Sequence, residues 1–181
     1  MDLLTISILA FVAFVAFDIL VLVFLASRKP NVFRVKRSTI IQAPADKIYP
    51  FINNLHNWKE WSPYDKLDPA MKKSYSGPAE GNGAVYEWEG NGKAGKGRME
   101  ITDTRRPSAV LMKLDFEKPF KNNCLVEFKL DSQGSKTEVT WDMHGPNKFI
   151  GKLVSVFLNM DKLVGKDFES GLANLKALAE K

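Results

Sequence analysis

The sequence predicts an α+β protein in which about seven antiparallel strands pack against a long C-terminal helix, preceded by an N-terminal transmembrane helix. Three features lead to this prediction: a start that is almost wholly apolar, a two-residue alternation after Pro63, and a helical apolar stripe at the end of the chain. A sheet with one apolar face and an amphipathic helix bury these surfaces against each other.

The first feature is the run from Leu3 to Ala26, which contains 24 residues and one charge, Asp18. At about 1.5 Å per residue, this helix would be about 36 Å long, enough to cross a hydrocarbon core of about 30 Å. A signal peptide has a basic start and an apolar run of about 7–15 residues, whereas no basic residue precedes Arg28. We therefore expect residues 1–27 to be an uncleaved anchor and residues 28–181 to be one domain.

Flanking charge predicts the orientation of this anchor. Residues 1–27 contain no lysine or arginine, and five basic residues follow at once: Arg28, Lys29, Arg34, Lys36 and Arg37. By the positive-inside rule, the protein is expected to cross the inner (cytoplasmic) membrane once, with its domain facing the cytoplasm. The lone cysteine, Cys124, agrees because it allows no internal disulfide. Asp18 either contacts a partner helix or reaches headgroups at the cytoplasmic end.

The charge of the domain points to lipid rather than nucleic acid. After residue 27 there are 26 basic and 19 acidic residues, a net charge of +7. The basic residues are scattered and do not alternate with aromatic residues. We interpret them as a solvated surface near anionic lipid, and we expect no nucleic-acid partner.

The segment from residue 32 to 62 predicts a strand and then helices. Val32 to Ile41 is rich in β-branched residues, which favours a strand. Pro44 suits the first turn of the helix that follows. Pro50 and the Asn-Asn pair after it suggest a break, so we expect two short helices, the second carrying Trp58 and Trp61. These tryptophans share a helical face and either latch the helices onto the sheet or line a cavity mouth.

Beyond Pro63, period-two alternation predicts six more strands, the first near residues 72–76. Glu87, Glu89 and Asp142 fall on the outer, solvent face. The residues expected to face inward are Tyr86, Trp88, Met99, Ile101, Met112, Leu114, Val126, Phe128, Val139, Trp141 and Met143. This apolar set suits a small-molecule pocket, but the same residues could instead fill a solid core.

The chain is expected to end in a long helix that covers the sheet. An apolar stretch from Phe149 to Leu158 precedes Asn159 and Asp161, either of which could cap this helix. Its apolar stripe consists of Leu163, Val164, Phe168, Leu172, Leu175 and Leu178.

Motifs for nucleotides, metals and nucleophilic catalysis are weak. Residues 90–95 fit the dinucleotide pattern G-x-G-x-x-G, but the next segment alternates like a strand where the motif needs a helix. His56 and His144 are the only histidines, and no G-x-S-x-G motif or ligand cluster accompanies them. We therefore expect no catalytic residues, no metal and no cofactor.

Residues from about 32 to 180 resemble the SRPBCC superfamily, which includes START-like, polyketide cyclase/dehydrase and lipid-transport proteins. The matching segments are IIQAPADKIYPFINNLHNWKEWSPYDKLDP, GNGAVYEWEGN, GKGRMEITDTRRP, the T-x-V-T-W strand at Thr137 to Trp141, and DKLVGKDFESGLANLKALAE. The resemblance implies a helix-grip fold, in which a curved sheet wraps the C-terminal helix around a cavity for lipids, sterols or polyketides. It implies no shared catalytic set.

Together these observations predict a membrane-tethered domain that binds a hydrophobic small molecule or lipid between sheet and helix. The residues expected to line the site are Tyr86, Trp88, Met99, Met112, Leu114, Val126, Phe128, Val139, Trp141, Met143, Trp58 and Trp61. Tyr86 is the one titratable group on the sheet wall, which favours binding over catalysis. The alternatives are a polyketide cyclase/dehydrase-like enzyme and an interaction module of the chaperone-activator or antitoxin kind.

Overall fold

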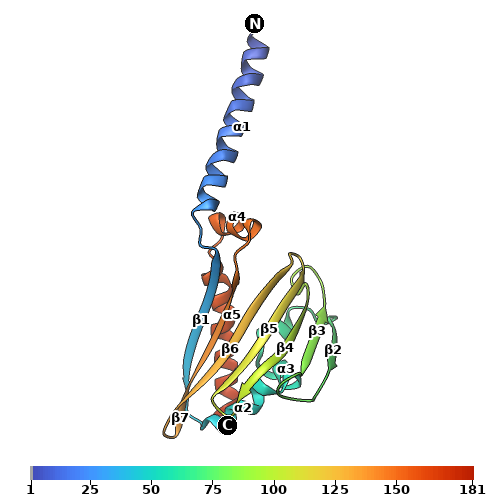
Figure 1. Ribbon diagram of the computed structural model, residues 1–181, viewed down its shortest axis with the longest axis vertical. Helices are drawn as coiled ribbons and strands as arrows, with labels where there is room; N and C mark the ends of the chain where they lie inside the picture. Colours follow the sequence, from blue (N-terminus) through green and yellow to red (C-terminus); the bar gives the residue numbers. More distant parts are fainter. Residues whose placement is uncertain (1) are drawn as a thin grey trace.

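The computed structural model describes residues 2–181, with one long helix standing off a sheet-and-helix domain (Figure 1). This helix, α1 (Leu3–Ser27), has 25 residues and a mean hydropathy of 3.0 over its most apolar window, so it could cross a membrane. Asp2 caps its start by accepting a hydrogen bond from the Thr5 backbone N–H at 2.9 Å. Its side chains are largely exposed to solvent.

The domain is built on one antiparallel sheet of seven strands in the order β1-β7-β6-β5-β4-β3-β2. This confirms the prediction of about seven strands in one antiparallel sheet. The first and last strands pair along their whole length, from Val32 with Pro146 to Ile41 with Thr137. The strands are β1 (Val32–Ile41), β2 (Lys72–Ser76), β3 (Val85–Glu89), β4 (Lys96–Arg105), β5 (Ala109–Lys118), β6 (Asn122–Gln133) and β7 (Lys136–Pro146).

The long helix α5 (Met160–Ala179) lies along the inner face of the sheet (Figure 1). Two glycines allow this close approach: a Cβ added to Gly171 would lie 2.8 Å from the Trp141 ring, and one added to Gly165 would overlap the Arg37 guanidinium. The buried stripe contains Phe168, Leu172 and Leu175.

The prediction for Leu163 was wrong, because its side chain is 57% exposed. It precedes by one position the series Val164, Phe168, Leu172, and one residue is about 100° around a helix. Asn159, one of the two predicted caps, accepts a hydrogen bond from the Lys162 backbone N–H at 3.0 Å.

Short helices connect β1 to β2 and cover part of the inner face. They are α2 (Ala45–Asn53), η1 (Leu55–Asn57), α3 (Trp58–Trp61) and η2 (Pro63–Lys66). Of the two break signals, Pro50 does not interrupt α2, which continues past this exposed residue, whereas the Asn53-Asn54 pair does end it, as predicted. The Asn54 side chain accepts from the His56 backbone N–H at 3.0 Å.

The outer face of the sheet holds one buried acid that alternation had assigned to solvent. Asp142 is 4% exposed, because β7 is flanked by β1 and β6. Arg34 on β1 covers it, with the guanidinium Nε 3.0 and 2.9 Å from the two carboxylate oxygens. Glu87 and Glu89 are exposed, as alternation predicted.

Between β7 and α5 the chain forms a further short helix, α4 (Phe149–Phe157). It packs against the end of α1 and buries Ala26 there completely. Figure 1 shows α4 lying across the lower end of α1, between this helix and the sheet-and-helix domain.

Candidate functional site

The inner sheet face is arranged in rows of residues that pair across the strands. One row joins Met112, Val126 and Met143, and the next joins Val110, Phe128 and Trp141. All six are buried. Because paired residues share a face of the sheet, each row is a strip of its inner wall.

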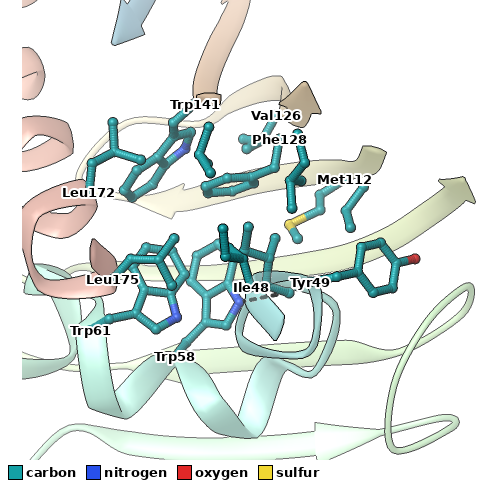
Figure 2. Close-up of a cluster of buried hydrophobic side chains, with 14 of the residues drawn as sticks. Ile48, Tyr49, Trp58, Trp61, Met112, Val126, Phe128, Trp141, Leu172 and Leu175 are labelled. Carbon is teal, nitrogen blue, oxygen red and sulfur yellow. Dashed lines mark hydrogen bonds between the residues drawn. The ribbon is translucent and has the colours of Figure 1, made fainter. Parts of the chain in front are cut away.

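The short helices cover the part of the interior that lies over these two rows (Figure 2). We call this part the closed half. Trp58 and Trp61 reach from α3 toward Phe128 and Trp141, with ring centroids 4.8 to 6.1 Å apart across the four. Phe168 of α5 stacks on Trp141 at 4.0 Å. All five side chains are at most 7% exposed, so they form a packed aromatic core.

Backbone acceptors fix the two tryptophans of α3 in place. The Trp58 indole N–H donates to the Ile52 carbonyl at 3.0 Å, and that of Trp61 donates to the Phe51 carbonyl at 2.9 Å. Buried indoles usually need such a partner. Both acceptors lie in α2, so these hydrogen bonds tie α3 to α2 and hold the pair over the sheet.

The interior nearer α1, which we call the open half, is covered less completely. Trp88 on β3 pairs with Gly97, which pairs with Phe116 on β5. A Cβ on Gly97 would lie 2.5 Å from the Trp88 ring, so the indole lies directly over this glycine. Leu114, in the next row, is also partly exposed. The partly buried apolar side chains here are Tyr64, Trp88, Leu114, Phe116 and Val164.

A polar cluster lies at the rim of the open half. The Asp65 carboxylate forms an ion pair with Lys73 at 2.9 Å and accepts a hydrogen bond from the Tyr86 hydroxyl at 3.2 Å. Its side chain is only 8% exposed, and its Oδ2 is buried without a hydrogen-bond partner. Lys73 pairs with Trp88 across β2 and β3, so this cluster borders the Trp88 row.

Burial sets the ionisation of the tyrosines at this rim. It raises the pKa of Tyr86, and the negative charge of Asp65 raises it further. Burial and the nearby Asp167 carboxylate likewise raise the pKa of Tyr64. Both phenols keep their protons at neutral pH, and Tyr86 uses its single O–H on the Asp65 carboxylate.

The structure places all twelve predicted site residues inside the domain, in two groups. Trp88 and Leu114 belong to the open half and are partly exposed. The ten that are buried are Trp58, Trp61, Tyr86, Met99, Met112, Val126, Phe128, Val139, Trp141 and Met143. Their role in binding a ligand stays a prediction.

Sequence reasoning missed Tyr64 and Asp65 as part of this site. They lie in η2, a single 3₁₀ turn that has no periodic apolar pattern to reveal its inner face. Pro63, which sets the first turn of η2, is the one local signal. Asp68, three residues after Asp65, accepts from the backbone N–H groups of Ala70 and Asn91.

Two hollows lie at the β2–β3 side of the described chain. One, of about 280 Å³, is lined by Leu55, His56 and the β2–β3 loop. His56 stacks on Tyr75 there at 3.9 Å, a packing role. The other, of about 260 Å³, is lined mostly by charged and polar residues of β2 to β5, including the outward-facing Glu87 and Glu89, with Trp88 and Gly97 among its lining residues. Neither of these two hollows is lined by α5.

The remaining motifs have structural roles in residues 2–181. The glycine segment at residues 90–95 is the β3–β4 turn and is followed by a strand, so it lacks the helix that a phosphate site needs. Asn91 organises this turn by accepting from the backbone N–H groups of Lys93 and Ala94. Within the same range, no three His, Cys, Asp or Glu side chains gather as a metal site.

Several solved structures share this fold. Ginseng major latex-like protein 151 from Panax ginseng is 14% identical, with a TM-score of 0.60 over 84% of this chain and 100% of that one. Protein CV1439 from Chromobacterium violaceum is 13% identical, with a TM-score of 0.58 over 84% and 99%. The Aha1 protein from Colwellia psychrerythraea, solved as a dimer, is 16% identical, with a TM-score of 0.57 over 82% and 96%.

No curated protein matches the chain. The sequence profile of the family described as polyketide cyclase / dehydrase and lipid transport matches residues 32–180, which is the whole sheet-and-helix domain. The chain therefore belongs to this polyketide cyclase / dehydrase and lipid transport family.

Proposed function

We propose that the protein is a membrane-tethered domain that binds a hydrophobic molecule between its sheet and α5. The observation that carries this proposal is the open half, where Trp88, Leu114 and Phe116 stay partly exposed on an otherwise buried face. Exposing large apolar side chains to water is unfavourable, and an apolar ligand would relieve that cost. The family description, which includes lipid transport, supports the same proposal.

The polar rim supports a narrower ligand class, a hydrophobic molecule with one hydroxyl group. The buried Asp65 Oδ2 lacks a donor, and an unpaired buried acceptor costs about 1–3 kcal/mol. A ligand hydroxyl could donate to Asp65 Oδ2, while the Tyr86 hydroxyl keeps its hydrogen bond to Oδ1. In this arrangement the apolar body lies over Trp88 and Leu114.

In this proposal, residues 1–27 are the anchor, residues 28–181 are the binding domain, and the domain lies on the cytoplasmic side. The length and hydropathy of α1 support the tether. The basic residues after α1, and none within it, support the orientation. Protease treatment of spheroplasts tests the orientation: the domain should survive, and digestion from outside would contradict it.

Photo-crosslinking tests the site. The full chain in lipid nanodiscs is mixed with a long-chain alcohol that carries a diazirine near its end, irradiated and mapped by mass spectrometry. We expect labels on Trp88, Leu114, Phe116, Tyr64 and Val164, because these side chains border the space that the ligand would fill. Labels confined to α1 and α4 would mean that the alcohol stays in the bilayer, and the proposal would fail.

A matched pair of variants separates the inner from the outer sheet face. Leu114→Trp adds bulk to the open half, whereas Leu125→Trp adds the same bulk to the neighbouring strand at a 54% exposed outer position. We expect Leu114→Trp to lose domain labelling and Leu125→Trp to keep it. Equal labelling of both would place the ligand elsewhere, and a protein-interaction role would then be the better explanation.

A further inference from the structure

Helix α4 is strongly apolar, yet none of its residues is buried. Six of its nine residues are Phe, Ile, Leu or Val. Ile150 and Phe157 are 53% and 71% exposed, and their spacing of seven places them on one face of the helix. Leu158, directly after the helix, is 53% exposed. An apolar patch of this kind on a soluble domain marks an interaction surface.

The position of α4 relative to α1 suggests what covers it. Figure 1 shows α4 crossing the lower end of α1 at a large angle. A helix that crosses the end of a transmembrane helix lies close to the plane of the membrane surface. The headgroup regions extend the bilayer to about 40–45 Å, so this plane falls within the interface.

Hydrogen bonds fix this arrangement. The short linker after α1 is bound to the loop before α4: the Asn147 backbone N–H donates to the Asn31 carbonyl at 2.7 Å, and its side chain donates to the Pro30 carbonyl at 3.0 Å. Lys152 of α4 donates to the Asn31 side chain. The domain is therefore held to its anchor, and α4 cannot swing away from the plane at which α1 ends.

The charge around α4 matches an anionic lipid surface. Residues 28–31, 118–121 and 147–158 contain six basic residues and no acid. The β5–β6 turn lies beside α4, because the Lys148 ammonium donates to the Lys121 carbonyl at 3.3 Å. This turn also carries Phe120, which is 58% exposed. Lysines flanking exposed apolar side chains are typical of helices that lie in a membrane interface.

We propose that α4 and the β5–β6 turn form an interfacial platform, with Ile150, Phe157 and Phe120 inserted among anionic lipid headgroups. This inference rests on the proposed tether. Its occupant is the bilayer itself, since the exposed patch continues from the end of α1. The open half lies at the same end, because Phe116 is two residues from the turn. The platform therefore holds the proposed ligand site against the lipid.

Depth-dependent quenching in the full chain tests the platform. Ile150→Cys and, as the matched control, Ser135→Cys are labelled with an environment-sensitive fluorophore. Ser135 is exposed in the β6–β7 turn at the far end of the domain, and the native Cys124 is 2% exposed. Both chains are reconstituted in vesicles of phosphatidylcholine and phosphatidylglycerol that contain lipids with a nitroxide near the headgroup.

We expect the label at residue 150 to lose most of its emission and the label at residue 135 to keep it. Equal emission at both positions, in chains that still float with the vesicles, would overturn the platform and leave the tether intact. Protection of residue 150 from both nitroxide lipid and aqueous iodide would also overturn it, because protein would then cover α4. Chains that do not float would overturn the tether and the platform together.

Charge reversal tests the role of the lysines. Lys121→Glu with Lys148→Glu should weaken quenching at residue 150 in vesicles that contain phosphatidylglycerol. In vesicles of phosphatidylcholine alone, quenching at residue 150 should differ less between this variant and the parent chain. The control variant, Lys36→Glu with Lys136→Glu, changes the net charge by the same amount, and Lys136 lies at the far end of the domain. Quenching at residue 150 should be stronger in this control than in the Lys121→Glu, Lys148→Glu variant. Equal losses in the two variants would contradict a contact at α4.

Discussion

The two halves of the domain interior share the same strands but are packed differently. In the closed half, Trp61 of α3 and Phe128 of β6 are fully buried. In the open half, Trp88 and Phe116 lie on the same sheet face but are partly exposed. The difference arises because the short helices cover only one end of the sheet. Stability and ligand binding can therefore reside at opposite ends of one face, so that changes in one need not impair the other.

The largest effect is expected for Trp61→Ala. Its side chain is fully buried, and its ring packs against Phe128 and Trp141 at 5.8 and 5.5 Å. Truncating a buried aromatic residue costs about 3–5 kcal/mol, and Trp58→Ala should cost a similar amount. Urea unfolding of the full chain in detergent, followed by circular dichroism, measures this. Unchanged midpoints would show that the closed half is not the stabilising core.

Trp88→Ala should cost less, about 1–2 kcal/mol, since a partly exposed side chain loses less on truncation. It gives up the hydrogen bond from its indole N–H to the Ala94 carbonyl at 3.0 Å and the edge contact with Phe116 at 6.0 Å. The same urea titration measures the loss of stability. In the photo-crosslinking experiment, Trp88→Ala should also lose most of the domain labelling although the domain stays folded. A cost equal to that of Trp61→Ala would remove the distinction between the halves.

The sequence predicted the closed half better than the open half, for a physical reason. Strand alternation and helix periodicity both record burial, so they identify residues such as Phe128 and Leu172 that are buried on one face. The open half is the part of the inner sheet face that the short helices leave uncovered, and no periodic pattern in the sequence records where such helices end. Tyr64 and Asp65 enter it from a single 3₁₀ turn, and the exposure of Trp88 depends on where α3 ends.

Burial of Asp142 was not predictable from alternation either. The period-two rule places it on the outer face, which is correct, but cannot show that Arg34 on a strand more than 100 residues away covers it. The position of α4 was unpredictable for the same reason. The sequence showed an apolar stretch at Phe149 to Leu158, but the place of this stretch at the end of α1 depends on tertiary contacts.

Alkaline pH should destabilise the fold through the rim tyrosines. The pKa values of Tyr64 and Tyr86 are raised above the ordinary value of 10.0. Below about pH 10 both the folded and the unfolded chain hold these protons, and the full stability is present. Above that pH the unfolded chain releases them first, so stability falls. Free energies of unfolding between pH 8 and 11 should show this decline.

A double variant tests this attribution. Tyr64→Phe with Tyr86→Phe removes both phenols, so it should flatten the decline above pH 10. A decline that stays equally steep in the double variant would assign it to other groups.

The smallest effect is expected at Cys124, which should react hardly at all in the folded protein. Burial raises the pKa of its thiol to about 11, so little thiolate forms at neutral pH. Cys124 pairs with Leu114 across β5 and β6, at the border between the halves. Its reaction with a thiol reagent should follow global unfolding in urea. Fast reaction in the native protein would show that the opening extends past Leu114.

The placement of the indoles gives the protein two separate optical signals. All four tryptophans lie in the domain and none lies in α1, so α1 makes no contribution to tryptophan emission. Trp58, Trp61 and Trp141 form one group with centroids 4.8 to 6.1 Å apart, and their shielded emission should shift to longer wavelength only when the fold opens. Trp88 is the single indole beside the proposed ligand, so a change in selectively excited tryptophan emission on adding ligand to native protein would come from this one side chain.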